Sequence, residues 1–180
     1  MSPKQDLLES LDRILVDYRD RFRKKKFTVK PERDDLLMRV FKITPEIKKR
    51  NMQYWSRHLG FAWEKLLKAA LSEADKTAVF PLPGDKQKPC DMIAGEMAID
   101  AKYRIGSGDS GTLQKLQKNG RILHELGYKP VLLIFRDDSL ASSLAAARGG
   151  GWTIYEDKHA LVHAETLFNF DMSAYLKSRI

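Results

Sequence analysis

Two aspartates and a lysine in the middle of the chain, Asp91, Asp100 and Lys102, have residue types and spacing that suit a metal site. If Gly95 and Glu96 form the two-residue loop of a β-hairpin, Asp91 lies directly opposite Asp100. The inner pairs, counted outward, are then Ala94 with Met97, Ile93 with Ala98, and Met92 with Ile99. Glycine first in the loop suits a type II′ turn. Opposed side chains lie roughly 4.5 to 5.5 Å apart at Cβ, and like charges there destabilise a sheet. We therefore expect a cation between the two carboxylates.

The ligand type predicts which cation this is. Carboxylate oxygens are hard ligands that suit Mg²⁺, Mn²⁺ or Ca²⁺, and Mg²⁺ is commonly held by one or two carboxylates together with water and phosphate. Strand alternation places Asp100, Lys102 and Arg104 on one face, so an ammonium lies beside the acid pair. Such a metal polarises a phosphoryl oxygen, and a nearby lysine orients the attacking water or stabilises charge on the phosphate. The pattern predicts a phosphodiesterase; the simpler alternative is an edge hairpin with solvated charges.

A further acid, Glu64, falls within a predicted helix over residues 60–71. Phe61, Leu67 and Leu71 recur there at helical spacing, and Glu64 lies on the same stripe. A carboxylate on the buried side of a helix is costly unless it is paired or binds a metal. Two interpretations stay open: Glu64 contributes to the metal site, or it lies at the edge of the stripe, where it reaches water or pairs with Lys68 four positions later.

Taken together, these residues resemble a known family. Glu64 on a helix, Pro89-Cys90-Asp91 on a strand, and Asp100-Ala101-Lys102 followed by a helix and a strand are similar to the PD-(D/E)xK nuclease superfamily, over about residues 58 to 136. Cys90 departs from the written motif because it separates Pro89 from the aspartate. The resemblance implies a restriction-endonuclease-like core. It also implies that Asp91 and Asp100 bind Mg²⁺, with Mn²⁺ as a possible substitute, that Lys102 assists the attacking water, and that Glu64 completes the metal site.

The remaining elements order well in such a core, which we expect to be an α/β fold bordering on α+β. The expected elements are strands at 77–82, 89–94, 97–104, 130–135 and 152–155 and helices at 112–126, 139–148 and 172–178. Gly127 suits the end of the helix over 112–126. A crossover through this helix permits parallel pairing of the strands on either side of it. The prediction is a mixed sheet flanked by helices, preceded by a helical N-terminal extension.

Length and composition bound the class of protein. The chain has 180 residues, of which 43% are hydrophobic, enough for the core of one compact domain. A single cysteine excludes an intrachain disulfide framework. No apolar run approaches the length of a membrane span, and the N-terminus lacks the hydrophobic region of a signal peptide. We therefore expect a cytoplasmic protein without a membrane partner.

The positive charge of the chain is concentrated near its N-terminus. Residues 1–58 contain 16 Lys and Arg against 9 Asp and Glu, whereas the rest of the chain contains 16 against 15. We predict that a basic helical region over 1–58 serves DNA contact and dimerisation, and that residues 59–180 form the nuclease core. Solvated surface is the alternative for these charges. Further expected DNA contacts are Arg104, Ser107, Gln114, Lys115 and Lys118.

The function predicted from the sequence is a Mg²⁺-dependent endonuclease that cuts double-stranded DNA, most like the type II restriction endonuclease of a restriction-modification system. Asp91, Asp100 and the Ala101 carbonyl would hold the metal, Lys102 would position the water, and Glu64 would complete or tune the site. One site per chain calls for a homodimer, whose two-fold symmetry matches a palindromic target. The alternatives are a structure-specific nuclease, such as a Holliday junction resolvase or a repair or phage nuclease, and a non-catalytic DNA-binding subunit.

Overall fold

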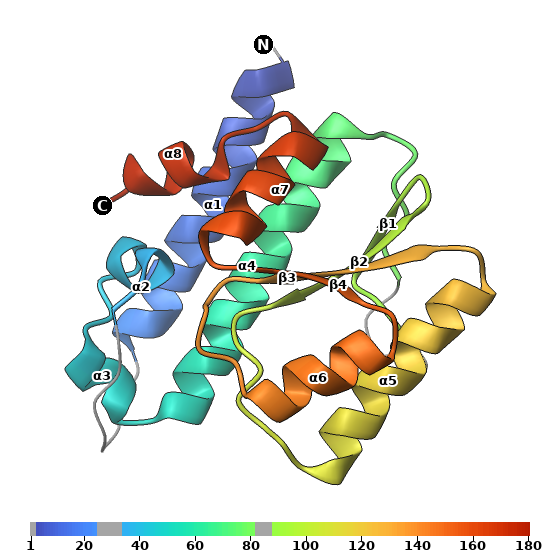
Figure 1. Ribbon diagram of the computed structural model, residues 1–180. Coiled ribbons are helices and arrows are strands. Elements are labelled where there is room, and N and C mark those ends of the chain that lie inside the picture. Colours follow the sequence, from blue (N-terminus) through green and yellow to red (C-terminus); the bar gives the residue numbers. More distant parts are fainter. Residues whose placement is uncertain (1–2, 25–33, 82–87) are drawn as a thin grey trace.

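A four-stranded mixed sheet lies at the centre of the protein, with helices on both of its faces (Figure 1). The computed structural model describes residues 3–24, 34–81 and 88–180. The strands lie in the order β1 (Met92–Ala94), β2 (Met97–Lys102), β3 (Lys129–Ile134) and β4 (Thr153–Glu156). β1 and β2 are antiparallel, and the other two pairings are parallel. The predicted fold class, a mixed sheet flanked by helices, is confirmed.

The predicted hairpin is present in the predicted register. Met92 pairs with Ile99, Ile93 with Ala98 and Ala94 with Met97. Gly95 has a φ of 53°, in the left-handed region that glycine adopts without steric cost, as the first position of a type II′ turn requires. Regular pairing starts at Met92, later than predicted, but the backbone amide of Asp91 still donates to the Ile99 carbonyl at 2.9 Å. Asp91 is therefore held at the end of the ladder, next to Asp100.

The strand predicted over residues 77–82 is wrong for the part that the structure describes, which ends at residue 81. There, Val79 makes only an isolated antiparallel bridge to Ile93. The side chain of Asp75 accepts hydrogen bonds from the backbone and hydroxyl of Thr77, at 2.8 and 2.7 Å, and this local turn competes with strand pairing. Pro81 adds to the effect because it has no N–H to donate to a ladder.

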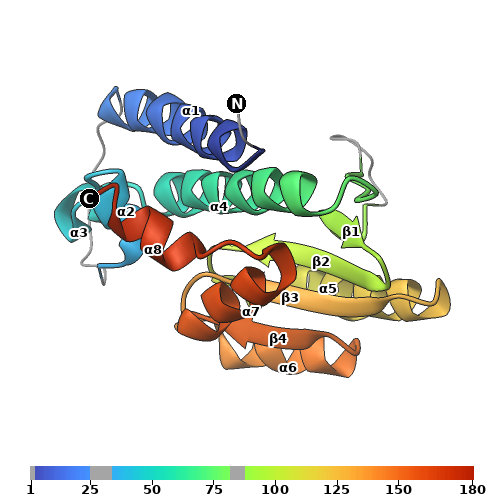
Figure 2. The ribbon, with the colours of Figure 1, turned by 90° about the horizontal axis from the view of Figure 1, so that it is seen from above.

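The helices form layers on either side of the sheet (Figure 2). α4 (Met52–Ala74) and α7 (Lys158–Phe168) cover one face, and α5 (Ser110–Glu125) and α6 (Ala141–Gly149) cover the other. β3 is apolar on both sides: Val131 and Leu133 pack toward α4 and α7, whereas Leu132 and Ile134 pack toward α5 and α6. Gly127, with a φ of 84°, follows the C-terminal cap of α5 as predicted.

The N-terminal helices extend the layer beside α4. α1 (Pro3–Arg23) packs along the outer side of α4, and α2 (Leu36–Val40), α3 (Pro45–Lys49) and α8 (Met172–Lys177) lie near one end of it (Figure 2). Leu11 and Leu15 of α1 belong to the same hydrophobic core as Leu66 and Ile99. The predicted boundary between residues 58 and 59 falls inside α4, and residues on both sides of it share one core.

The buried face of α4 is wider than the sequence pattern indicated. Leu67 and Leu71 are buried as predicted, but Phe61 is 39% exposed, so its place in the predicted stripe is wrong. α4 lies between α1 and the sheet, and therefore its buried residues, which include Trp63 and Leu66, extend over about half of its circumference. The predicted helix over 60–71 is the interior of this longer helix. Asn51 caps its N-terminus, because the Asn51 side chain accepts a hydrogen bond from the Tyr54 amide at 2.9 Å.

Buried charges connect the N-terminal helices to the ends of β2 and β3. Lys48 is fully buried, and its ammonium lies 2.5 Å from the hydroxyl of Tyr103. The Tyr103 hydroxyl donates to the carboxylate of Asp35, which also accepts from Arg136 at 3.1 Å. Asp138 binds the same guanidinium through both of its oxygens, at 2.8 and 2.9 Å.

No helix within the described residues is both long enough and apolar enough to cross a membrane.

Candidate active site

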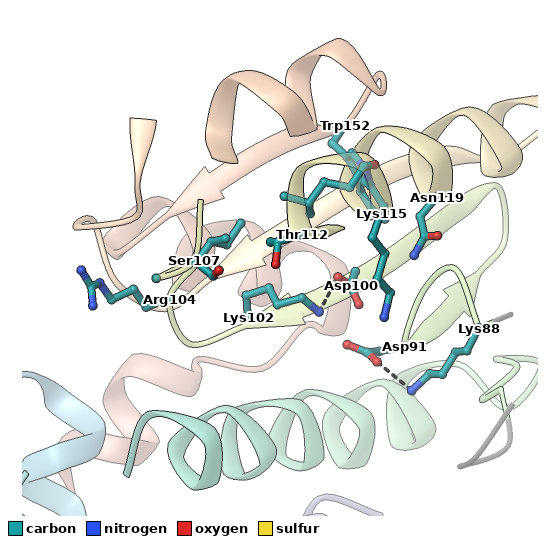
Figure 3. A pocket seen from close by; sticks show the side chains of 13 residues that line it. Lys88, Asp91, Asp100, Lys102, Arg104, Ser107, Thr112, Lys115, Asn119 and Trp152 are labelled. Carbon is teal, nitrogen blue, oxygen red and sulfur yellow. Dashed lines mark hydrogen bonds and ion pairs between the residues drawn. The ribbon is translucent and has the colours of Figure 1, made fainter. Parts of the chain in front are cut away.

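Asp91 and Asp100 lie face to face at the end of the hairpin (Figure 3). Asp100 is on β2 and Asp91 immediately precedes β1. Both are largely buried: Asp91 is 7% exposed, and the side chain of Asp100 is 13% exposed. The Asp91 carboxylate accepts a hydrogen bond from the backbone amide of Ala101 at 2.9 Å, which fixes it beside β2. The structure therefore places the two carboxylates together, although the paired register ends at Met92 and Ile99 and does not include the predicted pair of Asp91 with Asp100.

Two lysines supply the positive charge that the acid pair needs. The ammonium of Lys102 lies 2.5 Å from Oδ2 of Asp100 and 3.4 Å from the carbonyl oxygen of Ala101. The ammonium of Lys88, which lies in the segment before β1, is 2.7 Å from Oδ1 of Asp91. The prediction that Lys102 lies beside the pair is confirmed, whereas Lys88 was not foreseen.

The environment moves the pKa values of the two aspartates apart. Burial of its carboxylate raises the pKa of Asp100; Lys102 opposes this rise, and the neighbouring Asp91 adds to it. Burial also acts to raise the pKa of Asp91, but Lys102, a hydrogen bond donated by Asp100 and the ammonium of Lys88 together bring the pKa below its ordinary value. Two acids in contact cannot both ionise freely without compensating charge. Asp91 is therefore the member of the pair that stays ionised, and Asp100 is the member whose protonation changes when the local charge changes.

Glu64 lies on α4, close to the pair but not in contact with it. Its carboxylate is 2.5 Å from the ammonium of Lys68, which is the pairing that the sequence left as one of two alternatives. The same carboxylate is 3.6 Å from the ammonium of Lys88. Within the described part of the chain, no group of three or more histidines, cysteines, aspartates and glutamates could hold a metal ion. Glu64 is thus linked to the acid pair through a lysine.

The donor set of the pair still fits a hard divalent ion. Mg²⁺ is commonly held by one or two carboxylates, and the other positions are filled by water and substrate phosphate. Ile99 offers its carbonyl toward the β1 edge, because it accepts from the amide of Asp91. Alternation along β2 turns the Ala101 carbonyl toward the same edge, just beyond the end of β1. Two carboxylates and one carbonyl therefore converge from the hairpin.

The acid pair forms part of the wall of a cavity of about 540 Å³ between the hairpin and α5. Lys88, Lys102, Arg104 and Lys115 contribute four positive charges to its lining, against the two aspartates. Lys115 points from α5 toward the aspartates, and Thr112 lies near the start of the same helix (Figure 3). A cavity with excess positive charge next to paired carboxylates suits a phosphate-bearing substrate.

The residues predicted to contact DNA divide into two groups. Arg104, Ser107 and Lys115 line the cavity. Arg104 is held by the backbone carbonyl of Asp138 at 3.0 Å, and the Ser107 hydroxyl donates to Asp109. Gln114 and Lys118 are exposed on α5 and are not part of the lining, so the structure does not bring them to the site.

The lining also includes Asn119, Trp152 and Lys88, which the sequence did not assign to the site. Asn119 follows Lys115 by one helical turn, so helical spacing alone signalled that it shares the same face of α5. Its side-chain amide donates to the carbonyl of Pro89 at 3.3 Å. Trp152 comes from the segment before β4, and Lys88 comes from the segment before β1. No local pattern marks either residue, because both reach the cavity only through tertiary packing.

The chain matches no protein-family model, no curated protein and no solved structure. We therefore infer the function from the geometry and chemistry of this site.

Proposed function

We propose that the protein is a Mg²⁺-dependent endonuclease that hydrolyses phosphodiester bonds in double-stranded DNA, most like a type II restriction endonuclease. One observation carries the proposal: at the end of the hairpin Asp91 lies against Asp100, and the ammonium of Lys102 lies 2.5 Å from Asp100, at the wall of a basic cavity. Paired carboxylates with a lysine beside them are the groups that metal-assisted phosphate hydrolysis uses.

In this mechanism Asp91, Asp100 and the Ala101 carbonyl would hold the Mg²⁺, for which Mn²⁺ can substitute. The ion would supply Lewis-acid polarisation of a phosphoryl oxygen and the acidification of a water. Lys102 would orient the attacking water and stabilise negative charge on the phosphate as the bond to the leaving oxygen breaks. Arg104 and Lys115 would bind the neighbouring phosphates. Phosphates bound by these two side chains would set the scissile phosphate against the acid pair.

Cleavage of both strands with one site per chain calls for a homodimer in this proposal, with the basic N-terminal helices as candidates for dimer or DNA contact. The charge of α1 is partly balanced within the helix, since Arg21 pairs with Asp17 at 3.0 Å. The products distinguish the nuclease types: discrete fragments support a restriction endonuclease, and cutting confined to branched DNA supports a junction resolvase.

A second candidate function is a DNA-binding subunit in which the acids do no chemistry. The observation in its favour is that Lys88 and Lys102 already compensate Asp91 and Asp100, so that the pair can persist without a metal. The two candidates differ in whether DNA is cut. Mixed genomic and branched DNA incubated with the protein should be cleaved in Mg²⁺ and left intact in chelator. Binding without cleavage under either condition would favour the subunit.

Replacing Lys102 with methionine should slow Mg²⁺-dependent cleavage about a hundredfold, because the ammonium that orients the water is lost. Single-turnover rates with saturating protein measure this effect without the contribution of binding. Lys129→Met is a matched control, since Lys129 is 72% exposed in its side chain and pairs with Glu96 on the surface. The proposed role of Lys102 is wrong if both variants cleave at the unmodified rate.

Replacing Lys115 with glutamine should weaken DNA binding and reduce the dependence of affinity on salt, by about one unit in the slope of log K against log salt, as expected for one lost phosphate contact. Lys118→Gln removes the same charge from the same helix outside the cavity and should have a smaller effect. Fluorescence anisotropy in Ca²⁺ at several salt concentrations measures both. Equal losses for the two variants would place the DNA on the outer face of α5 instead.

A further inference from the structure

A line of alternating charges leads from the surface of α4 to the acid pair. The ammonium of Lys68 is 2.5 Å from Oε1 of Glu64, and the ammonium of Lys88 is 3.6 Å from the same oxygen. Lys88 also lies 2.7 Å from Oδ1 of Asp91. Lys88 is therefore shared between two carboxylates, with Asp91 as the nearer partner. The side chains of Lys88 and Glu64 are only 21% and 23% exposed, so water screens these contacts incompletely.

This arrangement sets Lys88 in competition with any divalent ion at Asp91. An ion bound there brings two positive charges to a carboxylate that the ammonium already neutralises, and like charges at such a distance repel strongly. Lys88 has a four-carbon stem with freely rotating bonds, which lets the ammonium move without a change in the backbone. Glu64 offers it another carboxylate within a short movement. Glu64 is itself anchored by Lys68, so it stays in place to receive the ammonium.

We propose that Lys88 is the counter-ion of Asp91 in the metal-free site and that Glu64 acts through Lys88. When a divalent ion binds at Asp91, the ammonium of Lys88 moves to Glu64, and Glu64 does not ligate the ion. This inference rests on the proposed function, since it assumes that Asp91 and Asp100 hold a divalent ion. Lys88 and Glu64 are positioning residues in this account. These roles differ from what the resemblance to the nuclease superfamily implies, namely that Glu64 ligates the metal directly.

If Glu64 acts through Lys88, the effects of the two residues on divalent-ion affinity depend on each other; if Glu64 ligates the ion directly, they are independent. Lys88→Met removes the competing charge and should tighten divalent-ion binding about tenfold. Glu64→Gln removes the second partner of the ammonium, which then stays on Asp91, and should weaken binding about tenfold. In a chain that already carries Lys88→Met, Glu64→Gln should change the affinity by less than about twofold. A directly ligating Glu64 would instead lose the same factor in both backgrounds.

The test is Mn²⁺ binding to the DNA-free protein, measured by isothermal titration calorimetry. The four proteins of the cycle are the unmodified chain, Lys88→Met, Glu64→Gln and the double variant, each checked for folding by circular dichroism. Glu73→Gln is the matched control, because Glu73 is also on α4 and pairs with Lys76 at 2.9 Å. It should leave Mn²⁺ affinity unchanged. Lys88→Gln should give the same result as Lys88→Met and replaces it if the methionine variant does not fold.

The outcomes separate this inference from the proposed function. An effect of Glu64→Gln that disappears in the Lys88→Met background supports the inference. Equal weakening by Glu64→Gln in both backgrounds, or no tightening by Lys88→Met, overturns the role of Lys88 while the metal site stands. If the unmodified chain binds no Mn²⁺, or if Asp100→Asn leaves the affinity unchanged, the metal site itself is wrong and both proposals fail.

Discussion

Replacing Asp100 with asparagine is expected to reduce the single-turnover rate of Mg²⁺-dependent DNA cleavage about a thousandfold, which corresponds to about 4 kcal/mol of transition-state stabilisation. Asparagine has nearly the same shape but lacks one hard oxygen and the negative charge. Asp100 lies against Asp91 and Lys102, so its loss affects both the metal ligands and the lysine that would orient the water. The measurement is a quenched time course on DNA that the unmodified protein cleaves.

The same substitution should leave the fold intact. Asp100→Asn removes a like-charge contact with Asp91, but it also removes the carboxylate that pairs with Lys102 at 2.5 Å, and these two effects on the folding free energy oppose each other. We therefore expect the metal-free variant to stay folded, with a free energy of unfolding in urea close to that of the unmodified chain. Loss of activity together with loss of structure would make the result uninformative about chemistry, so the two measurements belong together. Cleavage at an unchanged rate by a folded variant would remove Asp100 from the mechanism.

Replacing Asp35 with alanine should lower the free energy of unfolding by about 3 to 5 kcal/mol, the usual cost of breaking a buried ion pair from one side. Asp35 accepts from Arg136 and Tyr103, and it caps α2 by accepting from the Met38 amide at 3.0 Å. Without this carboxylate, the buried charge of Lys48 loses the acid to which Tyr103 connects it. Urea unfolding followed by circular dichroism gives the change in free energy.

The adjacent residue provides the control. Asp34 is 47% exposed in its side chain and pairs with Arg39 at 3.5 Å, a surface ion pair that typically contributes less than about 1 kcal/mol. Asp34→Ala should therefore have a small effect. Similar small losses for the two variants would show that the network of Asp35, Tyr103 and Arg136 does not stabilise the fold as its burial suggests.

The hairpin was predictable because local rules determine it. A two-residue loop beginning with Gly95 fixes which residues face each other, and a register shift of one residue would turn Ile99 and Ala101 away from the core that they share with α4. The end of α5 at Gly127 and the strand β3 follow from equally local signals, a residue suited to positive φ and a continuous apolar run. The acid pair and Lys102 came with the hairpin, so the centre of the site was accessible from the sequence.

The rest of the site depends on contacts between distant segments. Lys88 is a charged residue before β1, and nothing in its neighbours indicates that its ammonium lies between Asp91 and Glu64. The buried network is of the same kind, since Tyr103 bonds to Lys48 and Asp35, which precede it by 55 and 68 residues. Phe61 was predicted to be buried because of its helical spacing from Leu67 and Leu71. It is exposed because the packing of α1 and the sheet against α4 determines which side of the helix is covered.

The most direct test of the account is whether a divalent ion binds between Asp91 and Asp100. A crystal of the protein soaked in Mn²⁺ and measured for anomalous scattering locates such an ion without any assumption about the substrate. We expect a peak within about 2.0 to 2.6 Å of a carboxylate oxygen of each aspartate, with the Lys88 ammonium moved toward Glu64. The absence of a peak there at saturating Mn²⁺, with both lysines still on the aspartates, would contradict the proposal that this pair is a metal-dependent catalytic site.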